Sequence, residues 1–356
     1  MAPKIQPPIL VVRLSSLGDV ARLLPSLRAL QEGGIEADLT VEDRFAPLLD
    51  LFPLARRVVL YPRRRPGSPL RHPWAWSSAM GAYLRDLRAA RYGAALDLHG
   101  ILRSALVANL SGALETAGYA KGFGKEGSHL LYRTAVVPGP SPRISRYERY
   151  AGTLRALGLP APTEEPLSPR VPAAAALEVS DFLASRGISP GRYLFLFLGT
   201  SRAQARKRWP PERFQELAKQ AADRWGLVSL LGWGPEEEEV IASLEPSASL
   251  VPIPLWDLPR LVEAIRLCAA FVGADTGAMH LAALMGVPTV AVLGPTDPVL
   301  NRPFGPWSRV VHRPGIVRAC PGAGCAHADC MAAIRAEEAA EALGDLLGAQ
   351  VARRRP

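Results

Sequence analysis

Three loops in this sequence gather hydroxyl, glycine and charged residues directly after an apolar run. The first is the stretch VRLSSLGDVA at residues 12–21, which follows the run ILVV and precedes a helical pattern. Ser15 or Ser16 can cap that helix, and Gly18 lets another backbone come close. Asp19 falls in the first helical turn, where the helix dipole favours a negative charge. These features suit an ordinary helix start and an active-site loop equally, so the stretch alone leaves both interpretations open.

The second loop, GTSRAQARKRWPPERF at residues 199–214, follows the apolar run YLFLFL. It offers the hydroxyls of Thr200 and Ser201, backbone donors and, before Pro210, four cations, a combination that suits a polyphosphate held away from water. A solvated run of charge is the alternative. The position of the loop directly after a strand-like run favours phosphate binding.

The third loop, GADTGAMH at residues 273–280, again lies between a strand pattern and a helix pattern. Thr276 and Gly277 place backbone amides at a helix N-terminus, which is a ready anion site. His280 follows one helical turn later and faces either a ligand or the core. The sequence has no GxGxxG fingerprint and no GxxxxGK[ST] loop, which argues against a dehydrogenase or a P-loop NTPase.

The elements that position these loops alternate between strands and helices, which predicts an α/β fold with parallel sheets. The predicted strands cover residues 9–14, 37–42, 57–61, 94–99, 193–199, 227–233, 269–274 and 288–294. The predicted helices cover residues 20–32, 77–92, 211–225, 236–244, 258–268 and 277–286. A stretch with five prolines at residues 159–172 predicts a linker between two doubly wound domains. Such domains bind ligands at the carboxyl ends of their strands, where all three loops lie.

Charge and composition restrict the class of protein further. The chain of 356 residues has a net charge of +9, and residues 51–76 hold six arginines and no acidic residue, which indicates an anionic partner. No apolar run approaches the length of a membrane-spanning helix, and the N-terminal stretch has no cleavage-type pattern, so we expect a cytoplasmic protein. A nucleic-acid-binding protein would interleave aromatic and basic residues, and no repeating pattern of that kind occurs.

The three loops together resemble glycosyltransferase family 9, the ADP-heptose:lipopolysaccharide heptosyltransferases. The similarity rests on VRLSSLGD, GTSRAQARKRWPPERF and GADTGAMHLAALMGVPTVAVLGPTDP, which occur in the family's order and extend the resemblance over nearly the whole chain. It implies the GT-B fold, two Rossmann-like doubly wound domains that face a central cleft. We expect an acceptor-side domain at residues 1–165, a nucleotide-sugar-binding domain at 166–335, and a C-terminal helix with a basic tail at 336–356.

The resemblance also implies roles for individual residues. Asp19 matches the family's catalytic base, which removes the proton from the acceptor hydroxyl. The positions that match donor contacts are Thr200, Ser201 and Lys207 at the diphosphate, Glu236 at the ribose, Asp275 at the heptose hydroxyls, and Thr276, Gly277 and His280 along the diphosphate. The positions expected to meet the acceptor are Ser16, Gly18, Arg63, Arg64, Arg65, His99 and Arg103. The chain departs from the family at Arg22-Leu23, where a His-Thr pair is common, and at His99, where a Gln is common.

The expected reaction is an inverting transfer of heptose from ADP-heptose to the inner core of lipopolysaccharide, on Kdo or on the first heptose. We expect no cofactor and no metal, and as partners the nucleotide-sugar donor, the anionic lipopolysaccharide core with lipid A, and the inner face of the cytoplasmic membrane, but no nucleic acid. The alternatives are another nucleotide sugar used for a different surface polysaccharide, and a basic nucleic-acid-binding protein. Cys320, Cys325 and Cys330, with His327 as the candidate fourth ligand, lack the usual zinc spacing, so buried or reduced thiols are favoured over a metal site.

Overall fold

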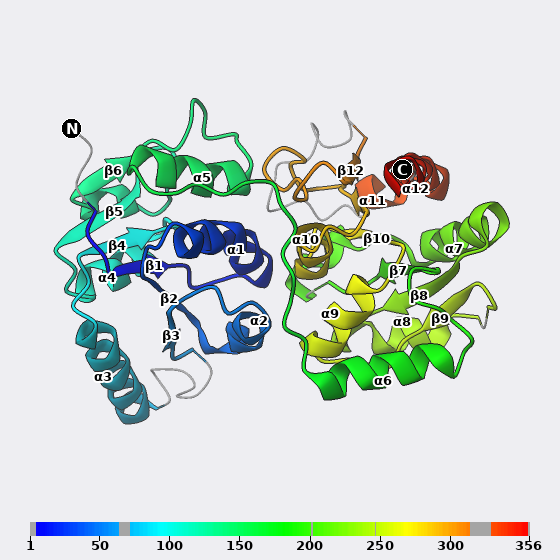
Figure 1. Ribbon diagram of the computed structural model, residues 1–356, viewed down its shortest axis with the longest axis horizontal. Helices are drawn as coiled ribbons and strands as arrows, with labels where there is room; N and C mark the ends of the chain where they lie inside the picture. The colour runs from blue at the N-terminus through cyan, green and yellow to red at the C-terminus, as the bar shows by residue number, and fades with distance from the viewer. Residues whose placement is uncertain (1–4, 64–71, 201, 246, 314–328, 355–356) are drawn as a thin grey trace. The chain divides into compact units, whose positions relative to one another are not determined.

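The computed structural model describes residues 5–63, 72–200, 202–245, 247–313 and 329–354. The chain divides into two compact units, Met1–Thr163 and Glu164–Pro356, coloured blue to green and green to red in Figure 1. The division lies inside the proline-rich stretch. Each unit is an α/β domain with its own sheet, which confirms the predicted fold class.

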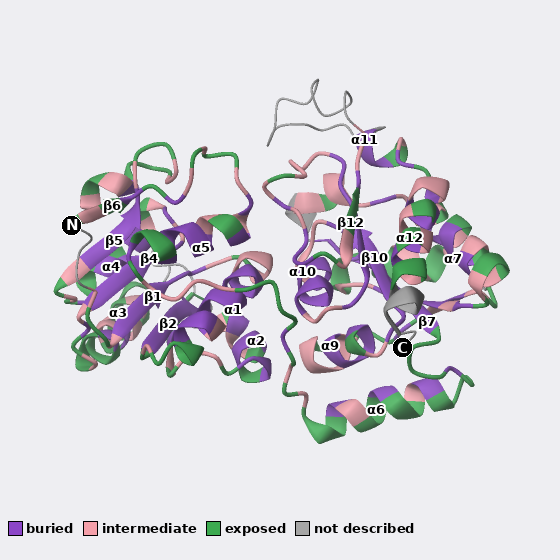
Figure 2. Ribbon diagram, turned by 45° about the horizontal axis from the view of Figure 1, so that its top comes forward, coloured by how far each residue is buried: buried purple, intermediate pink, exposed green. Residues whose placement is uncertain are grey.

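Unit 1 is built on a six-stranded sheet with the strand order β3-β2-β1-β4-β5-β6, and every pairing between these strands is parallel. The strands are β1 (Ile9–Val12), β2 (Ala37–Glu42), β3 (Arg57–Tyr61), β4 (Ala94–Asp97), β5 (Glu115–Tyr119) and β6 (Thr134–Val136). The helices are α1 (Leu17–Glu32), α2 (Ala46–Leu51), α3 (Pro73–Ala89), α4 (Leu102–Leu110) and α5 (Arg146–Ala156), with short 3₁₀ turns η1 (Asp43–Phe45) and η2 (Ser128–Leu131). β1 is fully buried because its ILVV side chains face helices on both sides, as parallel sheets require (Figure 2).

Unit 2 repeats this plan. Its sheet has the order β12-β11-β10-β7-β8-β9, again with parallel pairings between the named strands. The strands are β7 (Tyr193–Phe197), β8 (Val228–Gly232), β9 (Leu250–Pro252), β10 (Ala270–Ala274), β11 (Thr289–Val292) and β12 (Ser308–Val311). The helices are α6 (Ala173–Ala184), α7 (Pro211–Trp225), α8 (Glu238–Ser243), α9 (Leu258–Arg266), α10 (Gly277–Leu284), α11 (Asp329–Ala332) and α12 (Ala336–Arg354), with 3₁₀ turns η3 (Arg202–Lys207) and η4 (Pro235–Glu237).

The order of strands fixes where a ligand site can form. Counted within each unit, both sheets have the Rossmann order 3-2-1-4-5-6, in which successive strands are added on one side of the first strand and then, from the fourth strand on, on its other side. The crevice at that change of side lies beyond the carboxyl ends of β1 and β4 in unit 1, and of β7 and β10 in unit 2. The three loops singled out in the sequence follow β1, β7 and β10.

The loop after β7 is anchored at its far end by the core of unit 2. Trp209 is buried and packs edge-on against Phe214, with ring centroids 5.0 Å apart. Its indole N–H donates to the carbonyl oxygen of Ile334 at 2.9 Å, just before α12. The buried face of α12 joins the same core, so this C-terminal helix is part of unit 2 and helps to hold the loop in place. Among the described residues, no helix is both long and apolar enough to cross a bilayer.

Candidate functional site

Asp19 lies in the first turn of α1, at the carboxyl edge of the unit 1 sheet. α1 begins at Leu17, earlier than predicted, so Gly18 is its second residue and Ser16 takes the N-cap position. The Ser16 hydroxyl donates to the Asp19 carboxylate at 3.2 Å. The Ser16 backbone N–H points at the same carboxylate oxygen at 3.5 Å. Ser16 therefore takes the predicted N-cap position.

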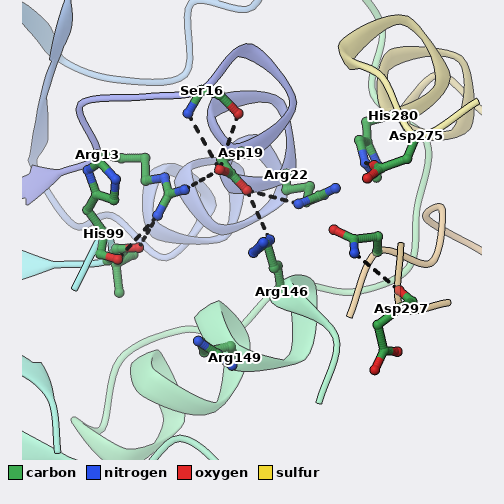
Figure 3. Close-up of polar contacts among 12 residues, drawn as sticks. Arg13, Ser16, Asp19, Arg22, His99, Arg146, Arg149, Asp275, His280 and Asp297 are labelled. Atoms are coloured by element: carbon green, nitrogen blue, oxygen red, sulfur yellow. Dashed lines mark hydrogen bonds and ion pairs between the residues drawn. The ribbon is translucent and has the colours of Figure 1, made fainter. Parts of the chain in front are cut away.

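Three arginines surround the Asp19 carboxylate, as Figure 3 shows. Arg13 directly follows β1 and lies 2.5 Å from Asp19 Oδ2, while Arg22, one helical turn further along α1, lies 2.9 Å from Oδ1. Arg146 is the first residue of α5, which packs against α1, and its Nε lies 3.1 Å from Oδ1. Three guanidinium groups thus face one carboxylate, and the cluster carries an excess of positive charge.

The three arginines determine the protonation state of Asp19. Burial acts to raise the pKa of Asp19, but the charges of Arg13, Arg22 and Arg146 outweigh it and hold the pKa well below its usual range. Asp19 is therefore a carboxylate at every pH at which the fold is expected to work. A carboxylate with so low a pKa accepts a proton poorly while the arginines face it.

His99 lies beside the same cluster because Asp97 shapes the end of β4. The Asp97 carboxylate accepts from the backbone N–H groups of His99 and Gly100 at 2.8 and 3.1 Å, which ends the strand two residues earlier than predicted. Arg13 Nη1 donates to the Leu98 carbonyl oxygen at 3.0 Å, so the loops after β1 and β4 are joined. Burial and the Arg13 charge lower the pKa of His99 to about 3, so its imidazole is neutral near neutral pH.

A second carboxylate with arginines, which the sequence analysis missed, lies at the end of β2. Glu42 is fully buried, and its backbone N–H donates to Leu14 at 3.0 Å, so it adjoins the loop that leads to Asp19. The guanidinium groups of Arg44, Arg103 and Arg63 lie 2.8, 3.2 and 3.6 Å from its oxygens. Two of them also lie over aromatic rings, Arg44 over Phe45 at 4.6 Å and Arg103 over Tyr61 at 5.7 Å.

Glu42 thus fixes two of the arginines that the sequence predicts to meet the acceptor, Arg63 and Arg103, and leaves them partly exposed. Arg64 and Arg65 lie outside the described residues. The carboxyl edge of this sheet therefore presents six arginines around two carboxylates. Such an edge attracts an anionic ligand, because the field of the unbalanced guanidinium groups extends into the solvent.

In unit 2 the loops after β7 and β10 meet through Lys207 and Asp275. Lys207 Nζ lies 2.8 Å from Asp275 Oδ2, and both side chains are mostly buried. His280, fully buried in α10, places Nε2 at 3.2 Å from the other carboxylate oxygen of Asp275. The sequence leaves open whether His280 faces a ligand or the core. The structure buries it and places its ring against the carboxylate of Asp275 (Figure 3).

Hydroxyl and amide groups lie around this pair. Thr276 is the N-cap of α10, and its hydroxyl accepts from Met279 N–H at 3.4 Å. Gly277 begins the helix, and first-turn amides have no partner inside a helix, so this end favours an anion. Within the described part of the chain, the buried hydroxyl oxygen of Thr200 has no hydrogen-bond partner. Ser201 lies outside the described residues.

The glutamate that organises the loop after β7 is Glu237. Its carboxylate is buried and accepts from Thr200 N–H at 3.2 Å and Gly234 N–H at 3.1 Å, and it pairs with Arg208. Glu236, the residue predicted to meet a ribose, is exposed beside it on η4. Glu237 is not among the site residues predicted from the sequence.

The cysteine segment contributes little to the described site. Cys320, Cys325 and His327 lie outside the described residues, and Cys330 is buried. In the described ranges, no group of three or more His, Cys, Asp or Glu side chains is arranged to hold a metal ion.

Comparison with known proteins agrees with this geometry. The sequence model of glycosyltransferase family 9 (heptosyltransferase) matches residues 80–322, more than half of the chain. Lipopolysaccharide heptosyltransferase 1 of Escherichia coli O18:K1:H7 is 30% identical over 86% of this chain and 92% of its own length. The enzyme of the same name from Pseudomonas aeruginosa is 29% identical over 83% of this chain and 81% of its own length.

Solved structures agree on the fold. Escherichia coli heptosyltransferase WaaC with ADP-2-deoxy-2-fluoro heptose has a TM-score of 0.69 and 25% identity, over 95% of this chain and 99% of that one. The glycosyltransferase family 9 protein from Veillonella parvula has a TM-score of 0.77 and 21% identity, over 95% and 96%. The chain therefore belongs to glycosyltransferase family 9, the heptosyltransferase family, and is a glycosyltransferase with the GT-B fold.

Proposed function

We propose that this protein transfers heptose from ADP-heptose to the inner core of lipopolysaccharide, with Kdo or the first heptose as acceptor. The observation that carries the proposal is the similarity to lipopolysaccharide heptosyltransferase 1, which extends over 86% of this chain. The arginine-rich edge of unit 1 supports an acceptor that bears carboxylates and phosphates. Lys207, Thr200 and the N-terminus of α10 support a diphosphate donor in unit 2.

In the proposed mechanism Asp19 acts as general base in an inverting displacement. Its carboxylate takes the proton of the acceptor hydroxyl while the hydroxyl oxygen forms a bond to the anomeric carbon of heptose. The bond from that carbon to the diphosphate oxygen breaks, and ADP leaves with the electron pair. Lys207 and the amides at the start of α10 stabilise the charge that ADP gains, so the transfer uses no metal ion.

The arginines around Asp19 have a part in this mechanism. When anionic groups of the acceptor bind Arg13, Arg22 or Arg146, these guanidinium groups attract the Asp19 carboxylate less. The pKa of Asp19 then rises toward the range in which a carboxylate accepts a proton well. The acceptor thus strengthens the base that deprotonates it.

A screen of donors by thermal shift tests the choice of sugar nucleotide. At a concentration about 100 times its Kd, a ligand that binds only the folded state adds about 2.7 kcal/mol of stability. ADP-heptose should raise the melting temperature by several degrees, and UDP-glucose and GDP-mannose should not. A larger rise with another nucleotide sugar would contradict the proposal and favour a family 9 transferase that acts on a different surface polysaccharide.

The low pKa of Asp19 predicts how the rate depends on pH. Because Asp19 stays ionised in the free enzyme, kcat/KM should show no loss from protonation of this carboxylate as the pH falls from about 8 to about 5. Arg146→Gln removes one of the three positive charges and raises the pKa of Asp19, but Arg13 and Arg22 remain, so its profile should also show no acid limb in this range. Profiles of kcat/KM for both proteins against a phosphate-free acceptor test this. An acid limb near pH 6 in the wild type, unchanged in Arg146→Gln, would contradict it.

A further inference from the structure

One face of α4 is apolar and exposed. Leu102, Leu106 and Leu110 follow one another at every fourth position, so they lie along one side of the helix, and they are 43%, 45% and 43% exposed. The opposite side, with Ala105 and Ala108, is fully buried against the sheet. α4 therefore has a second apolar side, made of these leucines, which is exposed among the described residues of unit 1.

Two further leucines extend this surface. Leu130 is 78% exposed on η2, which packs beside α4, and the Asn109 side chain donates to the Leu131 carbonyl oxygen at 2.9 Å. Leu114 follows α4 and is 69% exposed. We call Leu102, Leu106, Leu110, Leu114 and Leu130 the leucine face. Single exposed leucines are ordinary, but five on neighbouring elements mark an interaction surface.

Positive side chains border the leucine face. Exposed Arg88 reaches over from α3 and donates from Nε to the Leu110 carbonyl oxygen at 2.8 Å. Exposed Arg133 donates from Nη1 to the Leu114 carbonyl oxygen at 2.7 Å. At the other end, the backbone N–H of exposed Lys125 donates to Gly100, just before α4, at 2.7 Å. The nearby carboxylate of Glu126 is bonded to the Leu102 N–H at 3.1 Å.

Exposed leucines bordered by cations fit a lipid bilayer better than they fit a protein partner. Leucines that enter the acyl boundary, with arginine and lysine at their border for lipid phosphates, are the features of a surface that binds an anionic bilayer. The same helix carries Arg103, which reaches the Glu42 cluster at 3.2 Å. The leucine face therefore begins beside the arginines at the carboxyl edge of the sheet.

We propose that the leucine face docks on an anionic lipid bilayer and brings the carboxyl edge of unit 1 to an acceptor anchored there by its lipid. The choice of acceptor rests on the proposed function, whereas the docking itself rests on the leucines and their bordering cations.

Vesicle flotation of the full chain tests the docking. The probes are vesicles of phosphatidylethanolamine with phosphatidylglycerol, and vesicles of phosphatidylcholine alone. The wild type should bind the first and not the second, and Leu106→Ser with Leu110→Ser should weaken binding about tenfold. Leu177→Ser, on α6 in unit 2, removes a leucine that is 62% exposed and should change nothing. Arg88→Gln and Arg133→Gln should each weaken binding about fivefold, and less so at high salt.

Other outcomes would overturn the docking. Equal vesicle binding by the wild type and by the double leucine variant, with unchanged melting temperatures, would contradict it. Sedimentation that shows a dimeric wild type, a monomeric leucine variant and no vesicle binding would assign the face to a contact between copies. Heptose transfer to a delipidated acceptor separates the two proposals. This acceptor needs no bilayer, so the leucine variant should transfer heptose to it at the wild-type rate. A wild type that binds vesicles through these leucines and transfers no heptose would overturn the function alone.

Discussion

Replacing Asp19 by Asn should lower kcat by about 10²–10⁴-fold and leave donor binding in unit 2 unchanged. The amide keeps nearly the shape of the carboxylate but cannot take the acceptor proton. The three arginines lose their shared anion, so the melting temperature should also fall. The kinetic loss should remain at temperatures well below the new melting point.

The measurement is single-turnover transfer with saturating ADP-heptose, beside isothermal titration of the donor. Asp50→Asn is the matched control, since Asp50 is an exposed carboxylate at the end of α2 in the same unit and its replacement should leave kcat unchanged. An Asp19→Asn variant that is folded, binds donor and keeps near-normal turnover would show that Asp19 only anchors the arginines.

Lys207→Met should lower kcat by about 10²–10³-fold, because it removes the side-chain cation proposed to face the leaving diphosphate. Lys207 also holds Asp275 at 2.8 Å, so the variant leaves that carboxylate with the His280 contact and weakens the contacts proposed for the sugar. Because the lysine acts on charge that develops as ADP leaves, kcat should fall more than donor affinity does.

Lys219→Met, on the exposed side of α7, removes the same kind of cation from the same unit and should be silent. The measurement compares the fall in kcat with the rise in donor Kd, each determined separately for the two variants. A Lys207→Met protein whose loss appears only in donor Kd would assign Lys207 to ground-state binding and contradict its part in the transition state.

The positions of the three loops could be predicted because an apolar run followed by a helical pattern marks the carboxyl end of a parallel strand. The contacts between loops could not be read in the same way. Arg146 reaches Asp19 only because α5 packs against α1, and Lys207 reaches Asp275 only because β7 and β10 are neighbours in the sheet. Both facts depend on strand and helix order, which local patterns do not reveal.

The two missed glutamates illustrate a different limit. Glu42 ends the strand ADLTVE like any polar strand residue, and the arginines that pair with it come from three other segments. Glu237 stands in a run of four glutamates, and the 3₁₀ turn η4 decides which of them faces inward. The ribose contact expected of Glu236 stays a prediction, whereas the contacts with Thr200 and Arg208 belong to Glu237.

Arg22 is one of the positions at which this sequence departs from the family, and the structure shows what the arginine contacts. It stands where the family often has a His-Thr pair, and the structure gives it an ion pair with Asp19 at 2.9 Å. The arginine therefore places a further positive charge beside the proposed base. That charge favours a strongly anionic acceptor.

The proposed transfer is tested most directly by incubation of the wild type with ADP-heptose and Kdo-lipid A, followed by mass spectrometry of the products. The expected result is an acceptor that carries one added heptose, an equal amount of ADP, and almost no product with Asp19→Asn. Unchanged ADP-heptose, together with consumption of another nucleotide sugar by the same preparation, would contradict it.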